Sequence, residues 1–168
     1  MSVDLSAVIR RVPNHPRPGI LFYDVTPVFE EAEALRYCIA QLVDRARECE
    51  ADAILGIEAR GLILAGAVAA ELGIGMVMAR KPGKLPRGTM SREYQLEYGT
   101  DCLEIHEGAI APGSQVLLHD DLLATGGTAL AACGLVEDSG AAVAGAAFGL
   151  GTVFGFGLVS VVRTALAS

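Results

Sequence analysis

The segment that most constrains the fold is an apolar run followed by two acids and a loop of small residues. Residues 116–128 read VLLHDDLLATGGT. The apolar run predicts a buried strand, and the small residues predict a tight loop that opens a helix near Thr128. Glycine lets backbone N–H groups approach an anion, threonine hydroxyls add donors, and a helix N-terminus adds partial positive charge. The segment therefore predicts an anion-binding loop at the end of a strand.

Two adjacent acids, Asp120 and Asp121, stand in front of this loop. Carboxylates repel a phosphate, but they accept hydrogen bonds from sugar hydroxyls and can hold water around Mg²⁺. The acids and the loop together predict a site for a sugar phosphate. The alternative is an ordinary turn in which one aspartate caps a helix. The segment lacks the GxxxxGK[ST] and GxGxxG patterns, which excludes nucleotide triphosphatases and dinucleotide-binding folds.

The chain on either side alternates between helical and strand-like patterns. Apolar residues spaced by three and one predict a helix over residues 30–50, and helix formers ended by Gly73 predict another over residues 61–72. Short apolar runs predict strands at residues 53–57, 75–79, 115–118 and 142–148. Because strands and helices alternate, we expect an α/β fold with an open, mainly parallel sheet flanked by helices.

Such sheets bind ligands beyond the carboxyl ends of their strands. The loops at residues 58–61, 80–92 and 120–127 each follow a predicted strand, so we expect them to converge on one crevice. The first 30 residues are rich in proline and predict an irregular segment outside the sheet. A chain of 168 residues has the size of one domain.

Positive charge is concentrated in the second of these loops. Residues 80–92 hold five of the 13 lysines and arginines, including the only lysines, Lys81 and Lys84. Prolines and glycines disfavour regular structure there, so we expect a mobile loop that closes over an anionic leaving group; the alternative is a solvated surface loop. Arg60, in GIEARG, offers a planar donor suited to phosphate, and its alternative is an ion pair with Glu58.

Composition limits the partners of the chain. Its net charge of −7 and pI of about 4.9 argue against binding to nucleic acid or an anionic membrane. The four cysteines are widely spaced, so we expect them to be reduced, and we expect the chain in the cytoplasm. Residues 141–162 carry no charge and are long enough to cross a bilayer, at about 20 residues. The glycines within that segment favour buried strands over a membrane helix.

Several motifs resemble known enzymes. Residues 116–128 resemble the signature of the type I phosphoribosyltransferases. The stretches GIEARG, RKPGKLP and YQLEYGTDCLEIH look like the adenine phosphoribosyltransferases, and PRPGILFYDVTP resembles the N-terminal base-binding hood of that family. The resemblance runs from about residue 12 to residue 148. It implies a type I phosphoribosyltransferase fold with a hood over residues 1–30 and a core over residues 31–168, with a mobile loop at about residues 80–100.

The resemblance also implies the reaction. A purine ring nitrogen displaces pyrophosphate from phosphoribosyl pyrophosphate, with Mg²⁺, and adenine gives AMP. Asp120 and Asp121 face the ribose or Mg²⁺, while Glu97 and Tyr98 cover the reacting centre. The residues that bind phosphate or pyrophosphate are Arg60, Lys81, Lys84, Ala124, Thr125, Gly126, Gly127 and Thr128. The residues that bind the base are Leu21, Phe22 and Tyr23, although Phe22 could equally be a core residue.

The chain departs from the family at three places. Tyr23 stands where the family often has a basic residue, so a xanthine or guanine phosphoribosyltransferase remains an alternative. His119 stands where the family usually has an apolar residue, and we interpret it as a packed or solvated neighbour. The segment after Phe148 is short and nearly uncharged. The resemblance implies a homodimer, and a second alternative is a regulator that senses phosphoribosyl pyrophosphate without turning it over.

Overall fold

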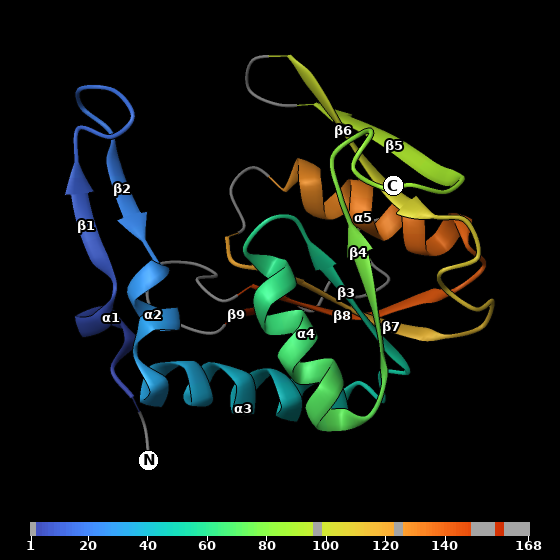
Figure 1. Cartoon of the computed structure of the whole chain (residues 1–168), viewed down its shortest axis with the longest axis horizontal. Coiled ribbons are helices and arrows are strands. Elements are labelled where there is room, and N and C mark those ends of the chain that lie inside the picture. Colours follow the sequence, from blue (N-terminus) through green and yellow to red (C-terminus); the bar gives the residue numbers. More distant parts are fainter. Residues whose placement is uncertain (1–2, 96–98, 123–125, 149–156, 160–168) are drawn as a thin grey trace. The chain divides into compact units, whose positions relative to one another are not determined.

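A computed structural model describes residues 3–95, 99–122, 126–148 and 157–159 (Figure 1). The chain divides into two compact units, Met1–Gln41 and Leu42–Ser168. Glu97, Tyr98, Ala124 and Thr125, four of the predicted site residues, lie outside the described residues.

The first unit contains α1 (Leu5–Val8), β1 (Arg10–Pro13), β2 (Leu21–Asp24), α2 (Thr26–Glu30) and the start of α3 (Ala32–Glu48). β1 and β2 form an antiparallel pair separate from the central sheet. Their turn begins at Asn14, which has φ of 60° and whose side chain accepts a hydrogen bond from the Gly19 N–H at 2.9 Å. The N-terminal segment was correctly placed outside the sheet, but the prediction that it is irregular was wrong.

The second unit is built on a five-stranded sheet in the order β4-β3-β7-β8-β9. Its strands are β3 (Ala53–Ile57), β4 (Gly75–Ala79), β7 (Gln115–Asp120), β8 (Ala142–Phe148) and β9 (Gly157–Val159). The first four run parallel and β9 is antiparallel to β8. The predicted fold class is confirmed, and β7 continues two residues beyond its predicted end at Leu118, so that the strand itself delivers Asp120.

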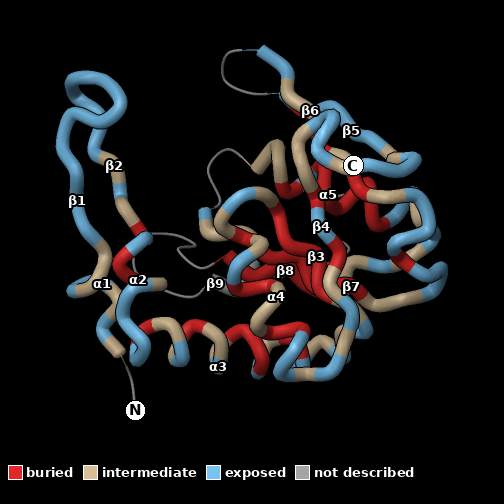
Figure 2. The backbone as a smooth tube through the Cα atoms, viewed as in Figure 1, coloured by how far each residue is buried: buried red, intermediate tan, exposed pale blue. Residues whose placement is uncertain are grey.

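Helices cover this sheet, and their ends follow local sequence signals. α4 (Gly61–Leu72) ends at Gly73, whose φ of 68° is left-handed and therefore suits glycine. α5 (Gly127–Asp138) packs against the sheet in a core whose fully buried members include Leu55, Leu118 and Leu135. Figure 2 shows this buried centre along β3, β7 and β8. Each large apolar side chain buried there contributes about 1.5–3 kcal/mol, which makes the sheet a rigid support for its loops.

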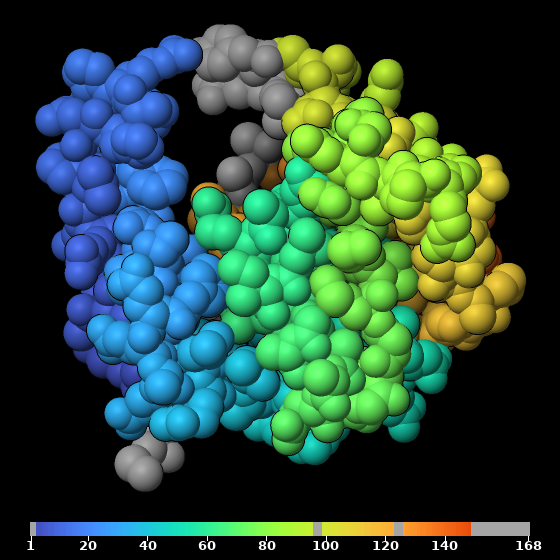
Figure 3. All heavy atoms as spheres, viewed as in Figure 1, coloured from blue at the N-terminus to red at the C-terminus, as the bar shows by residue number. Residues whose placement is uncertain are grey.

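A second antiparallel pair lies between β4 and β7 in the chain. β5 (Thr89–Gln95) pairs with β6 (Thr100–His106), in a register that places Tyr94 opposite Asp101. The backbone of Arg80 bonds to that of Glu104 on β6, which ties this hairpin to the end of β4. Irregular structure was expected to residue 92, but β5 already begins at Thr89. Residues 80–88 form neither helix nor strand and lie on the surface shown in light green in Figure 3.

The uncharged segment of residues 141–162 contributes β8 and β9 to the sheet. A membrane helix over residues 142–148 is therefore ruled out by the strand found there. Among the described residues, no helix is both long and apolar enough to span a bilayer. All four cysteines are described and free, as the sequence predicted.

Candidate active site

Three predicted loops follow strands that are neighbours in the sheet. β4, β3 and β7 lie side by side and parallel, so residues 80–88, 58–61 and 121–122 leave the same edge. The predicted convergence of these loops is confirmed for the described residues. It places three arginines, two lysines and two aspartates at this edge of the second unit, or in the loops that leave it.

An ion pair joins the loop after β3, residues 58–61, to the loop after β7, residues 121–122. Arg60 donates from Nε to Oδ2 of Asp121 at 2.5 Å, and the backbone N–H of Asp121 donates to Oδ1 of Asp120 at 2.8 Å. Glu58 accepts instead from Nε of Arg80 at 2.7 Å. The alternative pairing of Arg60 with Glu58 is therefore wrong. Arg60 is brought to the acid pair, 61 residues further along the chain.

Gly61 makes this approach possible. A Cβ atom built on Gly61 would lie 2.7 Å from the carbonyl oxygen of His119 and 3.1 Å from Cα of Asp120. Real Cβ atoms essentially never come within 3.0 Å of another heavy atom. Only glycine lets the start of α4, which follows Arg60, lie against the end of β7.

The acid pair is electrostatically strained. Burial raises the pKa of Asp120 well above its usual range, and the hydrogen bond and negative charge of Asp121 raise it further, while Arg60 acts in the opposite direction. A hydroxyl donor or a cation at this position would relieve that repulsion. No group of three or more metal-ligating side chains occurs among the described residues. The two aspartate carboxylates are oxygen donors of the kind that Mg²⁺ prefers.

The predicted phosphate loop leads into α5. Gly126 has φ of 85° and precedes the helix, no side chain of a described residue caps the helix start, and Thr128 lies in its first turn. Uncapped N–H groups at a helix N-terminus favour an anion. A Cβ on Gly127 would lie 2.7 Å from the carbonyl oxygen of Gln95, so this glycine is required where β5 crosses the helix.

The cationic side chains of residues 80–92 have separate partners. Nζ of Lys81 donates to the hydroxyl of Tyr94 at 2.6 Å and to the carboxylate of Asp101. Lys84 is exposed, and within the described part of the chain no ion pair involves it. Arg92 pairs with Asp138 of α5 at 3.5 Å, so it does not belong to the predicted anion trap.

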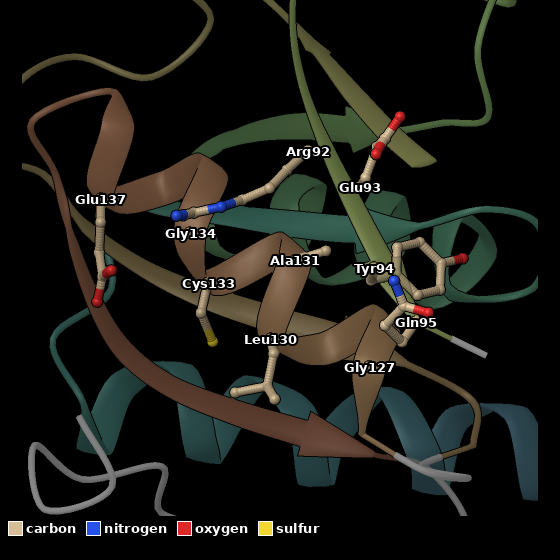
Figure 4. Close-up of a pocket in the computed structure, with 10 residues that line it drawn as sticks. All are labelled: Arg92, Glu93, Tyr94, Gln95, Gly127, Leu130, Ala131, Cys133, Gly134 and Glu137. Carbon is tan, nitrogen blue, oxygen red and sulfur yellow. The ribbon is translucent and has the colours of Figure 1, made fainter. Parts of the chain in front are cut away.

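Arg92 instead borders a groove of about 700 Å³ between β5 and α5 (Figure 4). Its guanidinium lies against Gly134, where a Cβ would come within 1.5 Å of a guanidinium nitrogen. One end of the groove reaches Gly127, at the start of the phosphate loop helix. The groove was not predicted, because it lies between α5 and β5, a strand that the sequence patterns did not predict.

His119 is fully buried on β7. Nδ1 bonds to the carbonyl oxygen of Ala147 at 2.9 Å, and Nε2 has no hydrogen-bond partner among the described residues. Burial lowers the pKa of His119 to about 4, so the ring is neutral at pH 7 and donates from Nδ1. The packed interpretation of His119 is confirmed.

The predicted base-binding residues lie on β2, in the first unit. Leu21 and Tyr23 are exposed, and Phe22 is partly exposed with its ring centroid 5.0 Å from that of His15 in an edge-to-face contact. Phe22 is therefore not a core residue. It leaves an aromatic surface on β2 that a flat apolar base would cover.

Sequence reasoning missed Tyr94 and Asp101, the partners of Lys81. The signal was present in YQLEYGTD, where a turn at Gly99 places residues 94 and 101 opposite each other in a hairpin. It was overlooked because the segment was considered only as a loop over the reacting centre.

Comparisons with known proteins agree with this geometry. The phosphoribosyl transferase domain model matches residues 29–150. An adenine phosphoribosyltransferase of Synechococcus sp. is 51% identical over 146 residues, which are 87% of this chain and 85% of the relative. The chain belongs to the adenine phosphoribosyltransferase family. The resemblance read from the sequence is thereby confirmed.

Solved structures of the family agree in fold. The adenine phosphoribosyltransferase of Rhodothermus marinus is 51% identical, with a TM-score of 0.79 over 86% of this chain and 82% of that one. The Saccharomyces cerevisiae enzyme, solved with adenine and an imino-altritol bisphosphate, is 39% identical, with a TM-score of 0.77 over 83% and 81% of the two chains. The type I phosphoribosyltransferase fold is therefore shared along most of the chain.

Proposed function

We propose that this chain transfers the 5-phosphoribosyl group of phosphoribosyl pyrophosphate to adenine, giving AMP and pyrophosphate in purine salvage. The observation that carries the proposal is the meeting of Arg60 with Asp121 beside the uncapped start of α5. This arrangement offers carboxylates for ribose hydroxyls next to backbone donors for a 5′-phosphate. Family membership supports adenine as the base, because the curated relatives are named for it.

The reaction exchanges one bond at the anomeric carbon. A ring nitrogen of adenine forms the new C–N bond, the C–O bond to pyrophosphate breaks with its electron pair, and the ring nitrogen loses its proton. Breaking this bond leaves a cationic sugar and concentrates negative charge on pyrophosphate. Arg60, Lys81 and Lys84 stabilise that charge more strongly in the transition state than in the ground state. Asp120 and Asp121 would help to hold Mg²⁺, which would supply further positive charge next to the leaving group.

The remaining roles follow from the family. Glu97 and Tyr98 cover the reacting centre, with Glu97 contacting the purine or taking its proton. Leu21, Phe22 and Tyr23 bind the base, and the partly exposed ring of Phe22 supports stacking. We also propose that the chain acts as a homodimer in the cytoplasm. Light scattering at micromolar concentration tests self-association.

The function is tested by release of pyrophosphate from phosphoribosyl pyrophosphate and Mg²⁺, with adenine, guanine, hypoxanthine and xanthine offered one at a time. Adenine-dependent release is expected. Asp120→Asn and Asp121→Asn should each reduce turnover, whereas Asp138→Asn, on the far end of α5, serves as the matched control. Release with another base only would overturn the specificity. Binding of phosphoribosyl pyrophosphate without release would overturn the reaction in favour of a sensor.

A further inference from the structure

Lys81 is held in a closed triangle of polar groups. Nζ of Lys81 donates to the hydroxyl of Tyr94 and to Oδ2 of Asp101, and that hydroxyl donates to the same Oδ2 at 3.2 Å. Nζ also lies 5.1 Å from the centroid of the Tyr94 ring. Lys81 comes from the loop after β4, Tyr94 from β5 and Asp101 from β6. The triangle therefore fastens the loop that follows β4 to both strands of the hairpin.

The members of the triangle differ in how firmly they are held. The Tyr94 ring is 8% exposed and packs into the core, and its Cδ2 lies 3.3 Å from the Cβ position of Gly127. The side chains of Lys81 and Asp101 are 35% and 32% exposed. Water reaches this ion pair, so it contributes only a few-fold to an equilibrium constant and can exchange partners. The Tyr94 side chain is therefore held in place by packing, whereas the Lys81–Asp101 ion pair can open.

Carboxylates also occupy the other donors of this loop. Glu58 accepts from the backbone N–H of Lys81 at 3.3 Å as well as from Arg80, and Glu104 accepts from the N–H of Gly83 at 3.2 Å. The loop proposed to bind pyrophosphate is thus already bound to anionic side chains. Asp101 likewise bonds to the ammonium group of Lys81. Among the described residues, Lys81 is the only lysine whose ammonium group forms an ion pair. An incoming pyrophosphate group must share that ammonium with Asp101 or displace it.

We propose that Asp101 is a built-in competitor of pyrophosphate: its carboxylate holds the ammonium group of Lys81 in the free protein and releases it when pyrophosphate binds. The inference rests on the proposed function, because it takes Lys81 as a pyrophosphate ligand. Displacement is favoured over sharing because two anions around one ammonium repel each other. Since linkage is reciprocal, the free energy of the Lys81–Asp101 pair opposes pyrophosphate binding by the same amount.

The test is the affinity of Asp101→Asn for inorganic pyrophosphate with Mg²⁺, measured by titration calorimetry. The amide keeps the shape of the side chain and removes its charge. The dissociation constant of the Asp101→Asn variant for pyrophosphate should be about two- to fivefold lower than that of the unaltered protein, the range that a partly exposed ion pair supports. Asp138→Asn removes the same charge from a side chain that pairs with Arg92, so it separates a local effect from the change in net charge. It should leave the affinity unchanged.

A double-mutant cycle tests whether Asp101 affects pyrophosphate affinity through Lys81. In a Lys81→Ala background, Asp101→Asn should no longer change the affinity. An unchanged or weaker affinity in Asp101→Asn alone, with an unaltered unfolding midpoint, overturns the inference and leaves Asp101 as a support for Lys81. If Asp101→Asn does not fold, Tyr94→Phe decides, because it removes the bridging hydroxyl and should shift the affinity in the same direction, by less.

The two proposals fail in different ways. Full pyrophosphate affinity in Lys81→Ala removes Lys81 from the site and sinks the inference, while adenine-dependent release by the unaltered protein still supports the enzyme. A protein that binds pyrophosphate through Lys81 but releases none with any base keeps the inference testable by calorimetry and loses the proposed reaction.

Discussion

Replacement of Gly61 by alanine should damage both stability and turnover. The new Cβ would lie 2.7 Å from the carbonyl oxygen of His119, whereas ordinary contacts begin at 3.4 Å. The start of α4 and the end of β7 must therefore separate by about 0.7 Å, and neither neighbour is a flexible side-chain end. Overpacking of this kind costs about 1–3 kcal/mol. The same displacement moves Arg60 from Asp121, and misplacement of about 1 Å at a reacting centre can cost on the order of 100-fold in rate.

Gly66→Ala is the matched control within the same helix. A Cβ on Gly66 would meet only the sulfur of Met76, at 3.5 Å, an ordinary contact. This substitution should stabilise the protein by about 0.5–1 kcal/mol through helix propensity and leave turnover unchanged. Urea unfolding measures the stability of both variants, and pyrophosphate release measures their turnover. Equal stability and equal activity in the two variants would refute the close approach of α4 to β7.

Three further predictions concern single side chains. Burial lowers the pKa of His119 from 6.5 to about 4, so this side chain binds a proton less readily in the folded protein than in the unfolded chain. The free energy of unfolding should therefore be highest above pH 6.5 and decrease by about 3 kcal/mol as the pH falls towards 4. His119→Leu should flatten that dependence in urea titrations between pH 7 and pH 4, and an equally steep dependence would contradict the assignment. Lys84→Ala should raise the KM for phosphoribosyl pyrophosphate while the unfolding midpoint stays within about 0.5 kcal/mol, and Lys84→Arg should restore the KM; unchanged kinetics would remove Lys84 from the site. Gly134→Ala should change the free energy of unfolding by less than about 1 kcal/mol, because Arg92 can swing into solvent and its exposed ion pair is weak; a larger loss would mean that Arg92 is fixed.

The edge strand β4 alternates between exposed and buried positions, but most of the central sheet was predictable because β3, β7 and β8 are buried along most of their length. Such strands appear as unbroken apolar runs, and β3, β4 and β8 begin and end where those runs do. Gly73 marked the end of α4 because a left-handed residue there suits glycine. The pair β5 and β6 was not predicted, since its outward-facing residues are polar and a window of five cations in residues 80–92 obscured the start of the strand.

The sequence predicted which residue types form the site, but it predicted their ion-pair partners less well. Local reasoning offered Glu58 to Arg60, two residues away, but Glu58 bonds to Arg80 on the neighbouring strand and Arg60 reaches Asp121. Parallel strands bring together side chains that are 20–60 residues apart, so proximity in the sequence is a poor guide to partners here. Arg92 was grouped with the other cations for the same reason, although β5 carries it to α5.

The pairing of charges at the strand ends has a consequence for which anions can bind. Arg60, Arg80 and Lys81 are each matched by a carboxylate, from Asp121, Glu58 and Asp101. A simple anion would gain these cations only by leaving three carboxylates without partners in a partly buried site, which is unfavourable. A ligand that carries phosphate groups together with hydroxyls and a divalent cation can satisfy both halves of these pairs. Its phosphates accept hydrogen bonds from the cationic side chains, its hydroxyls donate to the carboxylates, and the cation binds carboxylate oxygens. The internal ion pairs therefore select against small anions such as free phosphate. They favour a polyanionic ligand that also brings hydroxyl donors or a cation, and an acidic chain of net charge −7 can bind such a ligand without an open positive surface.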